Sequence, residues 1–179
     1  VGNASDNFFS ASSGNDTIDG KDGSDTVSYY NSPSAVTIDL SITTAQNTGG
    51  SGSDTLISIE GIIGTNYADS LTGNSNNNFL DGGSGNDTLT GGAGSDVFKF
   101  TSTPDAGTNI DTITDFTPGT DKILLSHNVF KSFSIPGAIS NDNLNSGSGL
   151  VNATAGHCGL PLSPVPGSGS TIRSGCWLT

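Results

Sequence analysis

The sequence predicts an all-β repeat fold, and two features predict it: a nine-residue period and a high glycine content. The chain of 179 residues contains 26 glycines, while hydrophobic residues make up only 31% of it. A fixed short period is typical of proteins that stack one small structural unit on the next. We therefore expect a thin core, built from a few apolar residues that recur at one position of the repeat.

The period is visible in two blocks, with units that begin at residues 2, 11 and 20 and at residues 64, 73, 82 and 91. The eighth position is always apolar: Phe9, Ile18, Val27, Leu71, Leu80, Leu89 and Phe98. The sixth position is always Asp or Asn: Asn7, Asp16, Asp25, Asp69, Asn78, Asp87 and Asp96. Because two independent columns persist through both blocks, a disordered acidic chain is a poor explanation of the pattern.

Each unit divides into a turn and a strand. Side chains alternate along a strand, so a three-residue strand at the end of each unit buries only its middle, eighth-position residue. The first six residues form the turn, where glycine permits positive φ and a close approach of neighbouring backbone. The pattern thus assigns the core to one column and the polar groups to the turns.

Adjacent units such as "GGSGNDTLT" (82–90) and "GGAGSDVFK" (91–99) resemble the RTX (repeats-in-toxin) nonapeptide G-G-x-G-x-D-x-U-x, in which U is a large aliphatic residue. The resemblance covers about residues 2–125. It implies a parallel β-roll (β-solenoid) of nonapeptide repeats, followed by an irregular β-rich C-terminal cap. It also implies that the repeats bind several Ca²⁺ ions.

In this family, two units complete one coil, so that alternate turns stack and each calcium lies between a turn and the turn two units later. Turn 64–69 is expected to stack on 82–87, 73–78 on 91–96, and 2–7 on 20–25. Calcium takes six to eight oxygen ligands, which loop carbonyls and carboxylates supply. The expected metal-binding residues are Asp69, Asp87, Asp96, Asp25, Asp16, Asn7, Asn78, Asp54, Gly82, Ser84, Asn86, Gly91, Ala93 and Ser95.

These sites are not equivalent. The Asn78–Asp96 pair should bind calcium more weakly than the Asp69–Asp87 pair, because it has one charge less. Asp16 has no partner in register two units later, unless the following insertion supplies one. The remaining acidic residues beside the turns are expected to be solvated surface carboxylates: Asp6, Asp19, Asp22 and Asp81.

We divide the chain into a first repeat block (1–28), an insertion that continues the solenoid (29–63), a second repeat block (64–99), a cap (100–150) and a divergent tail (151–179). In the insertion, "AVTIDLSI" alternates Val36, Ile38, Leu40 and Ile42 with polar residues, as a half-buried strand does. Ile59 is expected to face inward.

The cap resembles the segment that follows RTX repeats, with Asp111, Asp115 and Asp121 at its acidic positions and Leu124 where an Asp is expected. From about residue 155 the chain loses this character. We expect the tail, with Cys158 and Cys176, to be a foreign or divergent end outside the fold. Two cysteines allow at most one intramolecular disulfide and match no zinc spacing.

The formal net charge of −12 argues against nucleic acid and anionic membranes as partners and favours bound cations. No apolar run is long enough to cross a bilayer, and no catalytic motif survives inspection. His127 and His157 are isolated, so we expect no enzyme activity from this chain.

The expected function is a calcium-binding module that folds outside a bacterial cell, as part of a larger protein exported by type I secretion. One alternative is a module that binds a polysaccharide or a cell surface. A further alternative is the non-catalytic tail of a secreted protease, lipase or toxin.

Overall fold

The computed structural model describes residues 1–103, 107–126, 138–139, 162–163 and 171–173. All regular structure in these residues is β-strand, so the predicted parallel β-roll is confirmed. The strands are β1 (Phe8–Ser10), β2 (Thr17–Asp19), β3 (Thr26–Ser28), β4 (Thr37–Asp39), β5 (Gln46–Gly49), β6 (Gly52–Ile57), β7 (Gly61–Ile63), β8 (Ser70–Thr72), β9 (Phe79–Asp81), β10 (Thr88–Thr90), β11 (Val97–Phe100), β12 (Thr112–Ile113), β13 (Lys122–Leu125), β14 (Ala138–Ile139), β15 (Leu162–Ser163) and β16 (Thr171–Arg173).

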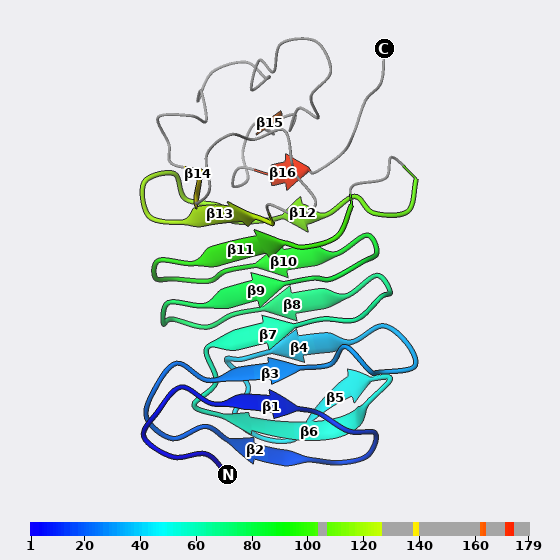
Figure 1. Cartoon of the computed structure of the whole chain (residues 1–179), viewed down its shortest axis with the longest axis vertical. Coiled ribbons are helices and arrows are strands. Elements are labelled where there is room, and N and C mark those ends of the chain that lie inside the picture. Colours follow the sequence, from blue (N-terminus) through cyan, green and yellow to red (C-terminus); the bar gives the residue numbers. More distant parts are fainter. Residues whose placement is uncertain (104–106, 127–137, 140–161, 164–170, 174–179) are drawn as a thin grey trace.

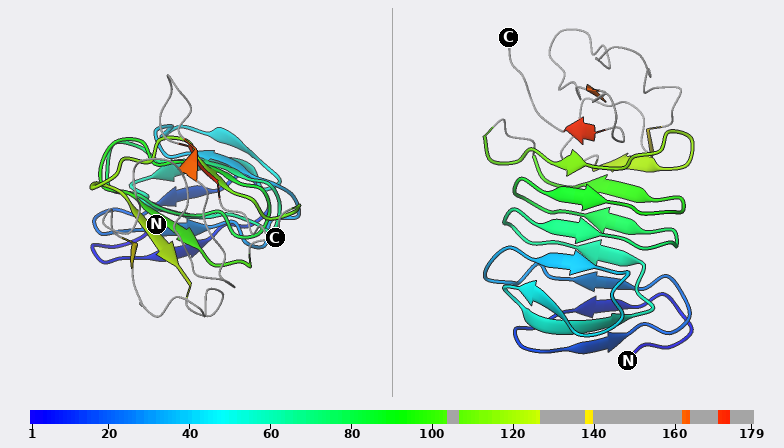
Figure 2. Two further views of the ribbon diagram at one scale, coloured as in Figure 1. Left: turned by 90° about the horizontal axis from the view of Figure 1, so that it is seen from above. Right: turned by 180° about the vertical axis from the view of Figure 1, so that it is seen from behind.

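The strands form two stacks, in which neighbouring strands pair in parallel except at β5–β6, β12–β16, β13–β14 and β15–β16. One sheet has the order β1-β3-β7-β9-β11-β13-β14, and the opposite side has β4-β8-β10-β12-β16-β15 together with β2-β6-β5. Strands of adjacent coils pair without slippage, as in Leu71 with Leu89 and Leu80 with Phe98. Figures 1 and 2 show the coils rising from the N-terminal end, with the turns projecting at both lateral edges. This register places equivalent turn positions directly above one another.

The core is a single ladder of inward side chains. Leu71, Leu80, Leu89 and Phe98 are completely buried, and Phe9 of the first coil is half-buried against the same cluster. The ladder continues through residues outside the two repeat blocks: Ile38, Leu56, Ile62, Ile113 and Ile123. Because each strand contributes one such residue, every coil depends on its neighbours for burial.

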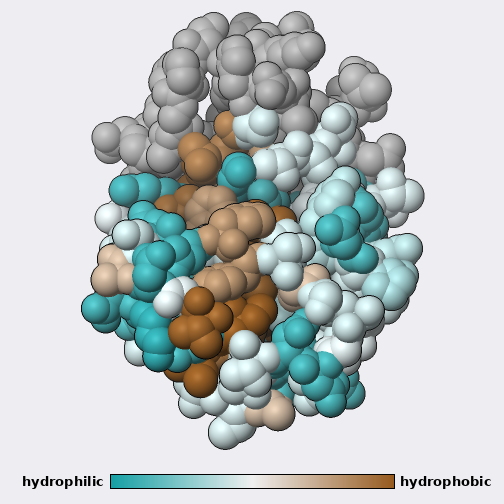
Figure 3. All heavy atoms as spheres, turned by 60° about the horizontal axis from the view of Figure 1, so that its bottom comes forward, coloured by the Kyte–Doolittle hydropathy of each residue, from teal (hydrophilic) through white to brown (hydrophobic). Residues whose placement is uncertain are grey.

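The outer surface is also divided into a hydrophobic part and a hydrophilic part. Seen from below, hydrophobic side chains form a central band and hydrophilic side chains lie at both lateral edges (Figure 3), where the turns project. The polar chemistry of the molecule is therefore concentrated at the edges of the roll.

The insertion differs from its predicted form in two places. The strand expected over 35–42 contains only Thr37–Asp39, since Asp39 begins a turn in which its Oδ1 accepts hydrogen bonds from the amide and hydroxyl of Ser41. Ile42, predicted to be half-buried, is therefore 40% exposed, whereas Val36, Ile38 and Leu40 are buried. Ile59 is buried, as predicted.

The second difference concerns the phrase "GGSGSD" (49–54). It reads as a repeat turn but forms the end of an antiparallel hairpin, in which β5 pairs with β6 across Gly49 and Gly52. Both glycines have positive φ, 77° and 108°. A phrase that resembles the repeat turn at 82–87 thus forms the end of a hairpin at 49–54.

The roll continues beyond the second repeat block. β12 pairs in parallel with β10, and β13 with β11, so the register crosses residue 99 without a break. The division of the chain into a repeat block and a cap remains a prediction. In the tail, the backbone of β16 pairs antiparallel with β12. Cys158, Cys176, His127 and His157 lie outside the described residues, as does most of the tail whose origin we questioned.

We predict that Leu89→Ala destabilises the calcium-loaded fold by about 2–5 kcal/mol, because it opens a cavity in a ladder that each coil shares with its neighbours. Thr90→Ala, on the outer side of the same strand β10, should cost much less. Urea unfolding in saturating calcium, followed by circular dichroism, measures both. Similar losses for the two variants would contradict a core made of one column.

Candidate metal sites in the turns

A backbone-to-carboxylate ladder joins the coils at both edges of the roll. In eight cases the residue two positions before an inward side chain donates its amide to a carboxylate oxygen of the equivalent residue in the next coil. Glu60 differs, since its amide donates to the Asp25 carbonyl. The donor and acceptor residues are Asn7 and Asp25 (2.7 Å), Asp16 and Asp54 (2.9 Å), Asp25 and Glu60 (3.0 Å), Val36 and Asp69 (2.8 Å), Asp69 and Asp87 (2.8 Å), Asn78 and Asp96 (2.8 Å), Asp87 and Asp111 (3.0 Å), and Asp96 and Asp121 (3.0 Å).

The ladder leaves three carboxylate oxygens without partners. In Asp25, Asp87 and Asp96, Oδ1 accepts the ladder bond, whereas Oδ2 is buried and accepts no hydrogen bond. The three residues are at most 1% exposed. An unpaired buried charge costs far more than any ordinary polar group, so these oxygens need a cation or a proton.

Glycine at the first position of a unit makes room for this carboxylate. A Cβ added to Gly82 would lie 2.2 Å from Oδ2 of Asp87, its own turn's sixth residue. The second position has a different constraint, since Gly83 has a φ of +91° and lies against the carbonyl of Thr65 in the turn below. The two glycines that open the motif therefore serve two separate purposes.

Carbonyl oxygens of the turns also lie beside the first-position glycines of the neighbouring coil. The carbonyl oxygen of Gly82 lies 2.5 Å from the position of a Cβ on Gly64, and that of Gly91 lies 2.2 Å from one on Gly73. Within the described residues, no hydrogen bond is donated to the carbonyls of the six turn residues that we expected to bind metal: Gly82, Ser84, Asn86, Gly91, Ala93 and Ser95. The turns thus offer neutral oxygens beside the unpaired carboxylates.

A second ladder, which the sequence did not lead us to expect, stiffens the turns. Fifth-position side chains accept the amide of a residue in the turn of the next coil. The pairs are Asp6 with Ser24, Asn15 with Ser53, Asn77 with Ser95, and Asn86 with Ile110. The side-chain oxygen of Asn86 is therefore committed to the protein, which leaves its carbonyl as the group available to a metal.

Other expected ligands are partly satisfied by the protein. Both oxygens of Asp69 accept hydrogen bonds, from Val36 and Thr65. Oδ1 of Asn78 accepts the amide of Asn74, while Oδ1 of Asn7 accepts that of Asn3. In the Asp69–Asp87 and Asn78–Asp96 pairs, the later turn therefore contributes the unpaired oxygen.

Asp54 departs from our expectation. The insertion supplies Asp54 as the partner that Asp16 lacked, but Oδ2 of Asp54 accepts the Tyr29 hydroxyl at 2.9 Å. The Thr48 hydroxyl lies 3.2 Å from the same oxygen and 3.0 Å from the Gly52 carbonyl, and it can donate its one proton to either. All three of Asp54, Tyr29 and Thr48 are 0% exposed. Burial, with the Asp54 charge added, raises the pKa of Tyr29 far above its ordinary value, so its hydroxyl keeps the proton that it donates. The second oxygen of Asp54 is therefore satisfied by a hydroxyl donor of the protein, where the repeats leave an unpaired oxygen.

Sequence reasoning missed Glu60 as a ladder residue and gave Asp111 and Asp121 no place in the ladder. Each stands two residues before an inward isoleucine: Ile62, Ile113 and Ile123. An acidic residue two positions before an isoleucine could have indicated these ladder positions. It was overlooked because the surrounding residues no longer follow the nonapeptide pattern. The Glu60 carboxylate accepts the Asp25 amide, and the Ser58 carbonyl lies close to the unpaired oxygen of Asp25 around Gly20.

The electrostatics of the turns depend on burial. Burial raises the pKa of Asp87 to about 8, against the effect of the Asp69 amide, and the negative charges of Asp111 and Asp69 raise it further. Burial also raises the pKa of Asp96, with Asp121 and Asp115 adding repulsion. In the metal-free fold, burial therefore disfavours the ionised form of both carboxylates.

Asp19 and Asp81, two acidic residues outside the ladder, have pKa values shifted in opposite directions. Asp19 is half-exposed and forms an ion pair of 2.6 Å with Lys21, whose hydrogen bond lowers the pKa of Asp19. Asp81, which we expected at the surface, is only 3% exposed. It accepts the Thr101 hydroxyl at 3.0 Å and lies 3.7 Å from Lys99, so burial raises its pKa while both partners lower it.

No three acidic, histidine or cysteine side chains gather around one point in the described part of the chain. A metal in these turns would therefore draw most of its ligands from carbonyl oxygens, with single carboxylates from successive coils. That donor set is composed of hard oxygens and suits Ca²⁺ rather than zinc or another thiophilic metal.

Comparison with known families agrees with this geometry. Residues 1–29 and 63–98 match the RTX calcium-binding nonapeptide repeat, in four copies. These two segments are RTX repeats. No curated protein matches the chain. The matched segments contain Asp25, Asp87 and Asp96, the three residues with an unpaired buried oxygen.

RTX repeats bind several Ca²⁺ ions, and the residues present fit that ion. Bound calcium would supply a positive charge that neutralises the buried carboxylates. Asp25, Asp87 and Asp96 would each contribute Oδ2, and the turn carbonyls would complete the shell. This assignment of individual ligands remains a prediction.

We predict that the calcium midpoint of folding rises as pH rises from about 6 to about 9. Asp87 has a raised pKa in the metal-free fold, so its protonation stabilises that fold at low pH and the benefit is lost as pH rises through about 8. The unfolded chain has no such raised pKa, so the proton favours the fold at low pH and less calcium is needed there to complete folding. Calcium titrations followed by circular dichroism at several pH values measure the effect.

Asp87→Asn serves as the control, because it removes the titrating group and should flatten the pH dependence. A midpoint in the unaltered chain that does not change over this range would contradict the assignment of Asp87.

Proposed function

We propose that this chain is a calcium-dependent folding module that becomes ordered outside a bacterial cell, as part of a larger protein exported by type I secretion. The observation that supports the proposal most directly is the set of three buried, unpaired carboxylate oxygens in Asp25, Asp87 and Asp96. A fold that creates these charges in its own interior is disfavoured until a cation binds.

Calcium acts on the whole roll because the sites share their supports. Asp87 accepts the amide of Asp69 below and donates its own amide to Asp111 above, so fixing one turn orients the next. A single site at a hundred times its dissociation constant stabilises the fold by about 2.7 kcal/mol, and coupled sites act together. The glycine-rich turns gain this order only on binding, since they lose much conformational entropy.

The concentration of calcium then couples folding to location. Extracellular calcium-binding modules commonly have dissociation constants of about 10⁻⁴–10⁻³ M, a range that leaves them empty in the cytosol. An empty chain with a net charge of −12 and few apolar residues favours an extended state that suits export through a narrow channel. The resemblance to exported RTX proteins is the further support for this location.

RTX repeats are non-catalytic structural modules, so the chemistry of a parent protein would lie elsewhere. Attachment to a secreted protease, lipase or toxin is compatible with the proposal. None of the described residues forms a helix that could cross a membrane.

We predict a cooperative, calcium-dependent gain of β-structure. Circular dichroism of the whole chain, first in a calcium chelator and then during titration with CaCl₂, measures it. Asp87→Ala should raise the calcium midpoint more than Asp19→Ala does, because Asp87 directs an unpaired oxygen into a turn whereas Asp19 forms an ion pair at the surface.

A spectrum that is unchanged in chelator would contradict the proposed function. Equal midpoints for the two variants would instead contradict the assignment of ligands, while leaving calcium-dependent folding intact.

A further inference from the structure

The insertion (residues 29–63) differs from the repeats in how its strands pair. Within it, β5 pairs antiparallel with β6, and Val36 forms an antiparallel bridge with Gly49. In the two repeat blocks, each strand pairs with a strand of an adjacent coil, as β8 does with β10 and β9 does with β11. The insertion therefore makes strand contacts with itself, whereas a repeat unit needs its neighbours for them.

The hydrogen bonds that hold the insertion join residues close together in sequence. Gln46 accepts the Asp39 amide at 2.8 Å and donates Nε2 to the Asp39 carbonyl at 2.9 Å, across seven residues. The ladder bond between Asp69 and Asp87 instead closes a loop of 18 residues. Because a short loop costs less entropy to close, the insertion can become ordered before the repeats do.

The insertion also contains a dense part of the core. Seven of its apolar side chains are buried: Tyr29, Val36, Ile38, Leu40, Leu56, Ile59 and Ile62. The two repeat blocks together contain the same number in nearly twice the length: Ala11, Ile18, Val27, Leu71, Leu80, Leu89 and Phe98. Burial of apolar area is the main favourable contribution to folding, so the insertion gains more of it per residue.

No buried charge is left unpaired when the insertion folds. Asp54, its one fully buried acidic residue, accepts the Asp16 amide with Oδ1 and the Tyr29 hydroxyl with Oδ2. The three buried carboxylate oxygens that lack a partner belong to Asp25, Asp87 and Asp96, all in the repeats. The insertion therefore does not need a cation to neutralise its interior.

We propose that the insertion is a calcium-independent folding nucleus, on which the calcium-dependent coils of the two repeat blocks assemble. The proposal rests on the calcium-dependent folding proposed above and adds a starting point for it. The nucleus presents strand edges to both blocks (Figure 1): β6 and β7 pair with β2 and β3 of the first, while β4 and β7 pair with β8 and β9 of the second.

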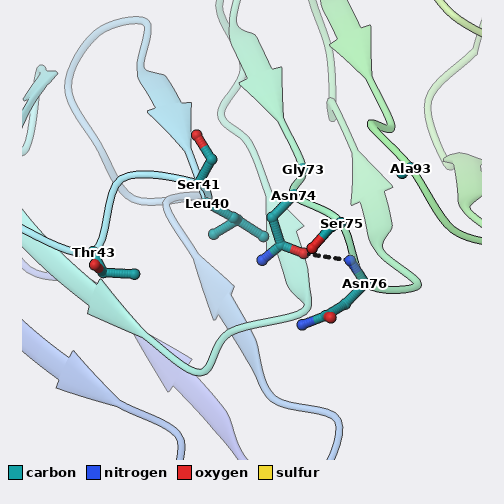
Figure 4. A pocket seen from close by; sticks show the side chains of 8 residues that line it. All are labelled: Leu40, Ser41, Thr43, Gly73, Asn74, Ser75, Asn76 and Ala93. Carbon is teal, nitrogen blue, oxygen red and sulfur yellow. Dashed lines mark hydrogen bonds between the residues drawn. The ribbon is translucent and has the colours of Figure 1, made fainter.

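The contact with the second block shows how the nucleus orders a repeat. Leu40, which is only 4% exposed, donates its amide to the Thr72 carbonyl at 2.9 Å. Figure 4 shows Leu40 beside Gly73 and Asn74, the residues that open the next repeat turn, and the three residues line one shallow hollow. An ordered insertion thus fixes the point where that turn begins.

Tyr29 and its neighbour Tyr30 provide a matched pair for the test. Tyr29 is 0% exposed and bonds to Asp54, whereas Tyr30 is 58% exposed and its hydroxyl makes no hydrogen bond in the described part of the chain. The Thr48 hydroxyl lies 3.2 Å from the same Asp54 oxygen and could replace the Tyr29 hydroxyl. Tyr29→Phe is therefore combined with Thr48→Val, so that both donors are removed.

The test is hydrogen–deuterium exchange of the whole chain in a calcium chelator, followed by mass spectrometry of its peptides. We expect amides of residues 36–63 to exchange about tenfold more slowly, or slower still, than those of residues 64–99. Tyr29→Phe with Thr48→Val should abolish this protection, because it leaves a buried charged acceptor unpaired. Tyr30→Phe with Thr44→Val, which makes the same chemical changes at two exposed residues, should retain it.

Fast exchange throughout the unaltered chain in chelator would overturn the nucleus and leave calcium-dependent folding intact. Protection that survives in the variant with both donors removed would also overturn it, as would an equal loss in the control. Slow exchange throughout the chain in chelator would contradict the proposed function, and with it the nucleus that rests on it.

Discussion

Successive coils of this roll are joined at their edges by hydrogen bonds from a backbone amide to a carboxylate oxygen, except between Glu60 and Asn78. In Asp87 this bond fixes Oδ1 on the amide of Asp69 and leaves Oδ2 buried inside the turn, without a donor. The contact that closes a coil therefore also creates a charge that the protein does not neutralise. A fold built in this way becomes favourable when a cation occupies the turn, because the cost of the buried charge then turns into a stabilising interaction.

The exceptions show that a cation is one of two solutions to this problem. Asp54 occupies the same ladder position, yet the Tyr29 hydroxyl satisfies its second oxygen, with the Thr48 hydroxyl nearby. Asp69 is likewise satisfied, by the amides of Val36 and Thr65. Tyr29, Thr48 and Val36 belong to the insertion and Thr65 to the second repeat block, so both parts of the chain supply donors at these two turns. The roll consists of coils that depend on calcium to different degrees, and the dependence is greatest where the nonapeptide is most regular.

Sequence variation at the turns also decides which groups hold each edge of the roll together. In unit 73–81 the acidic residue is replaced by Asn78, which uses its side chain to bind Asn74 and the Glu60 carbonyl. That turn is held by neutral groups of the protein, whereas the turn of Asp96 in the next coil keeps an unpaired carboxylate oxygen. A change in one column, from carboxylate to amide, therefore alters how far a turn depends on a cation.

The sequence by itself determined the repeat, the inward column that ends in Leu89 and Phe98, and the stacking of turns two units apart, because each depends on a local period that any reader of the chain can count. It did not determine the hairpin at Gly49 and Gly52, since the glycine-rich phrase there is compatible with two backbone paths. It also did not reveal that Tyr29 would reach Asp54 or that Glu60 would continue the ladder. Those outcomes depend on contacts between residues far apart in sequence, which only the closed coils bring together, and they decide which carboxylates are left for calcium.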